Sequence, residues 1–339
     1  MMTAGAAFAQ PAGLGPRPGT LETYRDWTIG CDNRNRCEAV SLLPEAAASP
    51  DAPVMLGVSR AAGADAGAQV WISRDAKGRS DLSIFIDGRK IASALSNDGE
   101  ARIEGPQAAA LAIAMARGGA MEIRAGQKVV GSPSLAGSAA ALRYMDARQG
   151  RAGTITALIA TGPLGATAVR PAPAVVVVKR APVPSGPPLA PLRREELAAL
   201  GKFTNCADEM KGAQPPGQYR LSKAETLIFV PCGAGAYNFT SIPVIATGIA
   251  GHRAYRLAAF DYQPGWSEDP RHPMLVNAGF TPEKSRLESF AKGRGLGDCG
   301  GSETYVWDGT RFRLIEASAM GECRGAWRWI TTWSARVVE

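Results

Sequence analysis

Six cysteines constrain the fold of this sequence more than any other feature. They are Cys31, Cys37, Cys206, Cys232, Cys299 and Cys323. No two form a Cys-x-x-Cys motif, and the chain has only two histidines to help complete a metal site. We therefore expect three disulfides, formed in an oxidising compartment, in preference to metal ligands or unrelated buried thiols. Of the possible pairings we favour sequential neighbours, namely Cys31–Cys37, Cys206–Cys232 and Cys299–Cys323.

The first residues also indicate export. Ala7-Phe8-Ala9 has the small-x-small pattern of a signal-peptidase site, with Gln10-Pro11 after it. The charged and most of the apolar regions of a signal peptide are missing, so the start is placed too far downstream or the sequence is shortened. The alternative is an alanine-rich disordered start. We expect a periplasmic or secreted protein.

Charge and histidine content exclude several classes of function. The formal net charge of +7 is spread evenly and forms no dense basic stripe, so we expect no nucleic-acid partner. No apolar run approaches the length of about 18 residues that a transmembrane segment needs. Two histidines argue against zinc enzymes and most serine-hydrolase triads. We identify no catalytic, metal-ligating or cofactor-binding residue, and expect no cofactor.

Proline divides the chain into two parts. Residues 1–20 are interpreted as a signal-peptide remnant and flexible leader, and residues 21–168 as an N-terminal β-rich domain. Residues 169–192 form a linker with seven prolines between Pro171 and Pro191, in which Val175–Val178 could pair as an edge strand. Residues 193–339 are predicted to form a second, disulfide-stapled β-rich domain.

Both domains have the pattern of an α+β, β-dominated fold with one or two packing helices each. Asp87-Gly88 and Asp308-Gly309 lie between apolar runs, which predicts type I′ hairpins. The other expected elements are strands at 54–59, 69–73, 121–130, 153–159, 226–232, 237–246, 253–262 and 326–337, helices at 107–116 and 193–210, and a helix capped by Ser134.

Three segments near the C-terminus carry a family resemblance. They are Lys-Gly-Arg-Gly-Leu-Gly-Asp-Cys-Gly-Gly from Lys292, Tyr-Val-Trp-Asp-Gly-Thr-Arg-Phe-Arg-Leu from Tyr305, and Glu-Ala-Ser-Ala-Met-Gly-Glu-Cys-Arg-Gly from Glu316. With the cysteine layout, they resemble a six-cysteine bacterial family catalogued as domain of unknown function 1176. The resemblance covers nearly the whole chain and implies export, without a reaction.

The N-terminal domain is also similar to the invasion-associated locus B family. The similar residues are Asp26-Trp27-Thr28-Ile29-Gly30-Cys31, Ser134-Leu135-Ala136-Gly137-Ser138 and Gln149-Gly150-Arg151. Neither family implies catalytic residues, so none is carried over. The resemblances support compartment and architecture only.

Aromatic and basic residues near the C-terminus form a candidate ligand surface. Trp327, Trp329 and Trp333 would share one face of the last strand, where they could stack on sugar rings or pack into the core. Arg324, Arg328 and Arg336 would occupy the opposite face and could bind anionic polymer or lipid headgroups.

Another candidate is the short loop between Cys31 and Cys37. A disulfide there would order a polar loop and present Arg34 and Arg36 as a recognition tip. The plainer alternative is a stapled turn.

Three further motifs do not carry a function. Ser289-x-x-Lys292 lacks the Lys-Thr-Gly strand of penicillin-binding enzymes. Gly295–Gly300 matches Gly-x-Gly-x-x-Gly but precedes a hairpin, so we interpret it as a bend beside a disulfide. His252 and His272 have loop settings without triad partners.

These observations favour a non-catalytic binding or interaction module of the cell envelope. Its partner would be an envelope glycan, an anionic polymer or another envelope protein. The alternative is a carboxylate-dependent, glycan-cleaving envelope enzyme, whose paired acids would leave no local motif. A mainly structural role is the third hypothesis.

Overall fold

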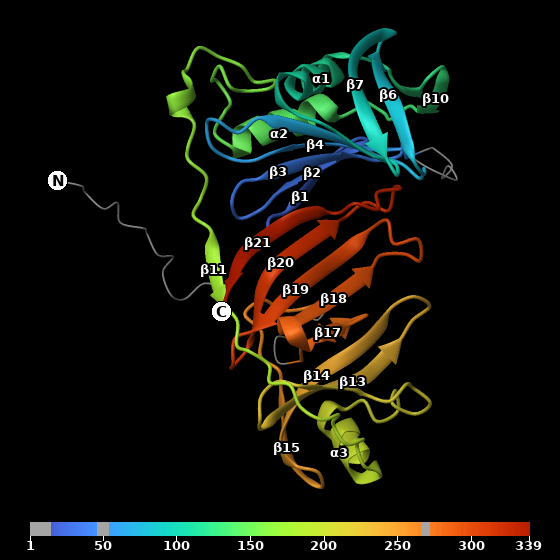
Figure 1. Cartoon of the computed structure of the whole chain (residues 1–339), viewed down its shortest axis with the longest axis vertical. Helices are drawn as coiled ribbons and strands as arrows, with labels where there is room; N and C mark the ends of the chain where they lie inside the picture. The colour runs from blue at the N-terminus through green and yellow to red at the C-terminus, as the bar shows by residue number, and fades with distance from the viewer. Residues whose placement is uncertain (1–14, 46–53, 266–271) are drawn as a thin grey trace, which may run out of the picture.

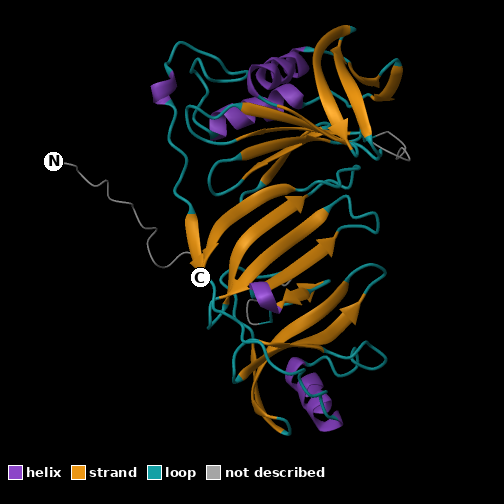
Figure 2. Ribbon diagram, viewed as in Figure 1, coloured by secondary structure: helices purple, strands orange, loops and turns teal. Residues whose placement is uncertain are grey.

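The computed structural model describes residues 15–45, 54–265 and 272–339. The candidate cleavage site at Ala7-Phe8-Ala9 lies outside these residues. The described residues form twenty-one strands and three α-helices, so the expected α+β, β-dominated fold class is confirmed (Figure 2). An N-terminal part with one large sheet and a C-terminal part with two sheets follow one another along the longest axis of the molecule (Figure 1).

A ten-stranded antiparallel sheet builds the N-terminal part. In sheet order its strands are β1 (Leu21–Tyr24), β2 (Trp27–Cys31), β3 (Cys37–Ser41), β4 (Met55–Arg60), β5 (Ala68–Ser73), β8 (Glu100–Ile103), β7 (Arg89–Asn97), β6 (Arg79–Ile86), β9 (Met121–Ala125) and β10 (Lys128–Gly131). The helices α1 (Gly105–Arg117) and α2 (Ser138–Arg148) pack on one face (Figure 1). The expected β6–β7 hairpin is confirmed, with φ of 48° at Asp87 and 76° at Gly88.

Ser134 does not cap the second helix. The helix α2 begins at Ser138, after Gly137 with φ of 99°, and Ser134 Oγ instead donates to Asp26 Oδ2 at 2.6 Å. A Cβ at Gly137 would lie 1.7 Å from the carbonyl oxygen of Tyr24. The close approach to β1 therefore requires glycine and delays the helix start.

The strand expected at 153–159 does not form. The backbone N–H groups of Leu158, Ile159 and Ala160 donate to the carboxylate of Asp146, which is 0% exposed at the end of α2. These donors are no longer available to a sheet. A short 3-10 helix, η1 (Ala166–Ala168), follows.

Two sheets share a hydrophobic core in the C-terminal part. The six-stranded sheet has the order β11 (Val176–Lys179), β21 (Ile330–Val338), β20 (Phe312–Met320), β19 (Gly300–Trp307), β18 (Arg286–Lys292) and β17 (Gly279–Thr281). The other sheet has the order β12 (Gly217–Arg220), β13 (Glu225–Ala234), β14 (Phe239–Ile249) and β15 (His252–Leu257), with β16 (Leu275–Val276) paired to β14. The helix α3 (Arg194–Thr204) packs on the second sheet, and a 3-10 helix, η2 (Pro282–Lys284), precedes β18.

Several expected bounds in the C-terminal part are wrong. The helix ends at Thr204, six residues before Met210, because Asn205 adopts a left-handed φ of 59° and Cys206 turns toward β13. The strand β15 ends at Leu257, before the expected residue 262.

The β19–β20 connection is not a type I′ turn. Gly309 has a positive φ of 102°, but Asp308 does not. Asp308 Oδ1 accepts the N–H groups of Thr310 and Arg311, both at 2.8 Å, and this side chain closes a four-residue loop in place of a two-residue turn.

One strand lies within the proline-rich segment. Val176–Lys179 form β11, which pairs in parallel with β21. Because valine fits a strand and the prolines lie outside it, this stretch joins the six-stranded sheet at its edge, as the run of valines allows.

Candidate functional site

All six cysteines form disulfides, in the sequential pairing expected from the sequence. Cys31–Cys37 joins β2 to β3, where the two cysteines are directly paired across the strands. Cys206–Cys232 ties the segment after α3 to β13, and Cys299–Cys323 ties the start of β19 to the loop before β21. Each disulfide thus stabilises a different region of the molecule.

The three tryptophans do not share one strand face. The strand β21 begins at Ile330, so Trp327 and Trp329 lie in the preceding loop. Trp327 is 42% exposed, and Trp329 stacks on Phe290 with ring centroids 4.7 Å apart. Trp333 is 5% exposed in the core between the sheets and donates its Nε1–H to the carbonyl oxygen of Leu314.

Arg324 and Arg328 bind the N-terminal part of the protein. Arg324 Nε and Nη1 donate to the carbonyl oxygens of Leu43 and Arg25, both at 2.7 Å, and Nη2 pairs with Asp26. The guanidinium carbon of Arg328 lies 4.3 Å from the centroid of the Trp71 ring. The loop before β21 is therefore the seam between the two parts, and its arginines are engaged there.

Apolar side chains fill the same seam. A buried cluster joins both parts, and its members are Val40, Leu42, Met55, Trp71, Cys299, Met320, Ala326 and Ile330. Asn33 also donates to the carbonyl oxygen of Ser334 and accepts its N–H, as a neighbouring strand would. The seam thus combines apolar burial with sheet-like hydrogen bonds.

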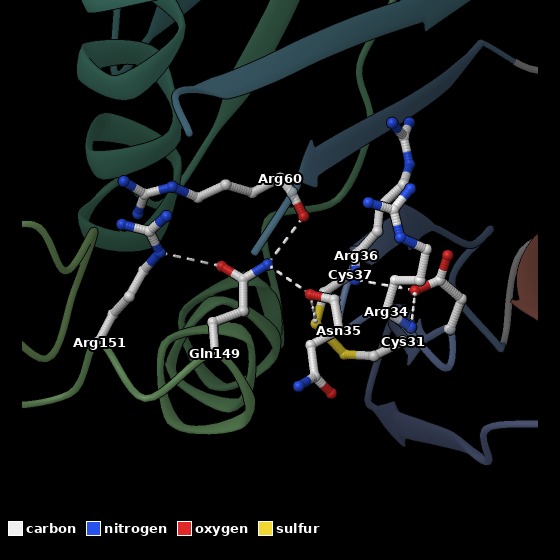
Figure 3. Close-up of a disulfide and its surroundings, with 9 residues drawn as sticks. Cys31, Arg34, Asn35, Arg36, Cys37, Arg60, Gln149 and Arg151 are labelled. Carbon is white, nitrogen blue, oxygen red and sulfur yellow. Dashed lines mark hydrogen bonds between the residues drawn. A yellow bond between two sulfur atoms is a disulfide. The ribbon is translucent and has the colours of Figure 1, made fainter. Parts of the chain in front are cut away.

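The loop from Cys31 to Cys37 is held on one side by Ser334 of β21 and on another by Gln149, which Figure 3 shows. The carboxylate of Asp32 accepts the backbone N–H groups of Arg34 and Arg36 at 2.8 and 2.9 Å, and Ser334 Oγ donates to its other oxygen. Gln149 Nε2 donates to the carbonyl oxygen of Asn35 at 2.9 Å (Figure 3). These contacts fix the backbone from which Arg34 and Arg36 extend.

Gln149 and Arg151, which carry part of the family resemblance, hold loops together. Gln149 also donates to the carbonyl oxygen of Arg60, and its Oε1 accepts from Arg151 Nε (Figure 3). Arg151 is 0% exposed and donates to backbone carbonyl oxygens of the loop at residues 63–66. Burial, together with the nearby Arg151, lowers the pKa of Arg60 to about 10. The cluster is cationic at neutral pH and organises backbone.

A groove beside β13 and β14 is not predicted by the sequence analysis. Its volume is about 650 Å³, within the range of about 300–1,000 Å³ usual for ligand sites. Tyr219 and Phe229 line it with ring centroids 5.2 Å apart, although Phe229 is only 6% exposed, and Phe239, 61% exposed, is a further lining residue. Among its described lining residues Glu209 alone is charged. The groove therefore offers aromatic faces and uncharged polar groups.

Two asparagines position the exposed aromatic residues. Asn238, which is 8% exposed, donates to the carbonyl oxygen of Lys292 and accepts its N–H. Asn277 donates to Asn238 Oδ1 and accepts the N–H of Phe239. In the sequence, two aromatic residues flank a polar one at Tyr237-Asn238-Phe239, shortly after Gly233 and Gly235. This pattern is the signal that could have revealed the site.

A second feature missed by the sequence analysis is a partly buried carboxyl group. Glu303 lies on β19 directly opposite Ser289 of β18. Burial raises the pKa of its carboxyl group to about 7, although hydrogen bonds from Gly265 and Ser289 act in the opposite direction and lower this pKa. Tyr305, two residues further on, is 0% exposed, and its hydroxyl has no hydrogen-bond partner among the described residues. The chain thus carries a carboxyl that titrates near neutral pH.

The remaining motifs have structural surroundings. Ser289 is 1% exposed and accepts the N–H of Val276. Gly293, next to the glycine-rich segment, would place a Cβ 2.6 Å from Cys299 Sγ, which is why the bend beside this disulfide needs glycine. His252 begins β15, and His272 is exposed.

Within 15–45, 54–265 and 272–339, no group of three or more His, Cys, Asp or Glu side chains could hold a metal ion. None of the helices in that part of the chain is long and apolar enough to cross a membrane.

The fold and its three disulfides define a β-dominated, disulfide-stapled protein of two connected parts. The chain belongs to the family described as protein of unknown function (DUF1176), which matches residues 21–336. The uncharacterized protein YpfG of Escherichia coli (strain K12) is 29% identical over 343 residues, or 92% of each chain. The crystal structure of invasion associated protein B from Bartonella henselae is 17% identical, with a TM-score of 0.29, over 38% of this chain and 98% of that one.

Proposed function

We propose that this protein is an exported, non-catalytic binding protein of the cell envelope, in the periplasm or secreted. Three disulfides that use every cysteine support an oxidising compartment. The arginine and tryptophan surface expected from the sequence is largely engaged in the seam or the core. The groove beside β13 and β14 is therefore the better candidate for the binding site.

The chemistry of the groove indicates an uncharged, ring-bearing ligand such as a glycan segment. The single observation that carries this proposal is the exposed Phe239 in a groove that Tyr219, Thr240 and Ser241 also line. Aromatic faces stack on sugar rings, while hydroxyl groups such as those of Thr240 and Ser241 bind sugar hydroxyls. A lining with one charged residue, in a chain of net charge +7, disfavours a polyanion at this site.

The test is binding of the full chain to a glycan array and to a soluble oligomer of β-1,4-linked N-acetylglucosamine. We expect Phe239→Ala to weaken binding up to tenfold, because an aromatic stacking contact contributes about 0.5–1.5 kcal/mol. Ile249→Ala is the matched control, since this residue is 74% exposed at the opposite end of β14. No glycan binding, or equal losses in both variants, would overturn the proposal.

Glu303 favours a second candidate function, a carboxylate-dependent glycan-cleaving enzyme. A carboxyl with a pKa of about 7 is protonated often enough at neutral pH to donate a proton to a leaving group. Asp261 is a second carboxylate of the C-terminal part, but its oxygens already accept hydrogen bonds from Arg313 Nε at 2.6 Å and from the N–H of Leu314 at 2.8 Å. Release of reducing ends from a glycan by the wild type, abolished in Glu303→Gln, would favour the enzyme over the binding protein.

A further inference from the structure

We propose that Arg34 and Arg36 of the disulfide loop, together with Arg336 of β21, bind the phosphate groups of an anionic phospholipid surface. This site is separate from the groove, and its occupant differs in charge.

The backbone of the loop between Cys31 and Cys37 is held rigid. Cys31–Cys37 closes its base, and Asp32 N–H donates to the carbonyl oxygen of Arg36 at 2.9 Å. Asn33 is held by Ser334 and Asn35 by Gln149, as described above. Two arginines on such a frame lose little backbone freedom when they bind.

The guanidinium groups of Arg34 and Arg36 lack partners among the described residues. The side chains of Asp32 and Asn33 are engaged by the protein, while Arg34 and Arg36 extend away from Gln149 (Figure 3). Neither guanidinium has a hydrogen bond or ion pair within the described part of the chain, and Arg34 Nε is buried without a partner. The loop's only carboxylate, Asp32, is 5% exposed and is occupied by backbone N–H groups and Ser334. The loop thus presents uncompensated positive charge.

Arg336 of β21 lies on a strand face that is turned toward this loop. Ser334 Oγ reaches Asp32, so the face of β21 that carries Ser334 is turned toward the loop. Arg336 lies two residues further along the strand, on the same face, and is exposed. No ion pair of Arg336 is found among the described residues. Three arginines from two elements therefore face one side of the molecule, and the exposed Glu316 of β20, which pairs with Ser334, lies on the same strand face as Arg336.

Guanidinium chemistry selects the ligand. The planar fork of arginine matches the paired oxygens of a phosphate group, and several forks held apart on a rigid frame suit a surface with repeated phosphates. An anionic bilayer provides such an array, and attracts each nearby basic residue with about 1 kcal/mol, which is about a fivefold change in binding.

The experiment is co-sedimentation of the full chain with vesicles of phosphatidylglycerol and phosphatidylcholine, against vesicles of phosphatidylcholine alone. We expect binding to the anionic vesicles that high salt suppresses. Arg34→Gln/Arg36→Gln should weaken it about 25-fold, and Arg336→Gln about fivefold, at roughly fivefold per arginine. Unfolding midpoints should stay unchanged, because the replaced groups have no partner in the protein.

The control removes the same charge elsewhere. Arg89→Gln/Lys90→Gln changes two exposed residues of the β6–β7 hairpin and should bind nearly as well as wild type. An equal loss in this control would mean attraction by net charge and overturn the proposal. So would absence of vesicle binding, or calorimetric binding of inorganic phosphate without vesicle binding. Phe239→Ala should retain vesicle binding, so failure of the groove proposal is recognised separately.

Discussion

Arg324 is the side chain whose removal most directly tests how the two parts are held together. Its guanidinium donates to the carbonyl oxygens of Leu43 and Arg25 and pairs with Asp26. Arg324→Ala removes these donors and leaves two carbonyl groups and a carboxylate at a closed seam. Ser134 still donates to Asp26, so the carboxylate keeps one partner.

The expected loss follows from the burial of the pair. Hydrogen bonds to charged groups contribute about 1.5–3 kcal/mol each, whereas an exposed ion pair contributes about 0–1 kcal/mol. The side chains of Arg324 and Asp26 are 17% and 15% exposed, which places their pair between these limits. We expect the variant to lose about 3 kcal/mol of the free energy of unfolding.

The assay is urea unfolding followed by tryptophan fluorescence and circular dichroism. Asp26→Asn and the double variant complete a thermodynamic cycle, and Arg89→Ala, on an exposed hairpin, is the control that should change little. Arg324→Lys should recover only part of the stability, because one ammonium group cannot reach all three acceptors. A loss below about 1 kcal/mol in Arg324→Ala, or no coupling to Asp26, would refute the reasoning.

Burial raises the pKa of Glu303 from 4.5 to about 7, so the folded state favours the protonated form. This preference contributes about 3 kcal/mol to the free energy of unfolding. The contribution is fully present below pH 4.5 and is lost as the pH rises to about 7. Glu303→Gln should flatten this dependence in unfolding curves between these pH values; an unchanged slope contradicts it. Cys206→Ala/Cys232→Ala should lower the free energy of unfolding by about 3 kcal/mol, because the unfolded chain regains the entropy that the closed loop removes. The same variant should loosen the groove wall at Thr240 and Pro231, since Thr240 donates to the carbonyl oxygen of Cys232. An unchanged urea midpoint counts against this prediction. Cleavage at a protease site inserted after Gly186 should leave both fragments co-eluting in gel filtration, since β11 and the seam lie across the cut; separate elution contradicts a continuous seam.

Local patterns in the sequence predict local structure well. Asp87-Gly88 needs only two left-handed residues between apolar runs, and the sequential disulfides join residues close in the chain. The similar prediction for Asp308-Gly309 fails because the Asp308 side chain supplies an alternative closure of the loop. Fold class therefore follows from residue patterns, while turn type depends on side-chain competition.

The candidate site depends on contacts that no local pattern contains. Arg324 contacts residues 281 to 299 positions earlier, and those contacts keep residues before Ile330 out of the last strand. The odd-numbered tryptophans therefore separate into an exposed, a stacked and a buried ring. Phe239 becomes a site residue only because Asn277, 38 positions later, fixes its backbone.

The position of β21 links the two parts of the molecule. It lies between β20 and β11 and contacts β2 and β3 across the seam. Until it pairs, the edges of β11 and β20 remain open, and the seam lacks Ile330. β21 therefore ties the two parts into one structure through both its strand pairing and its seam contacts.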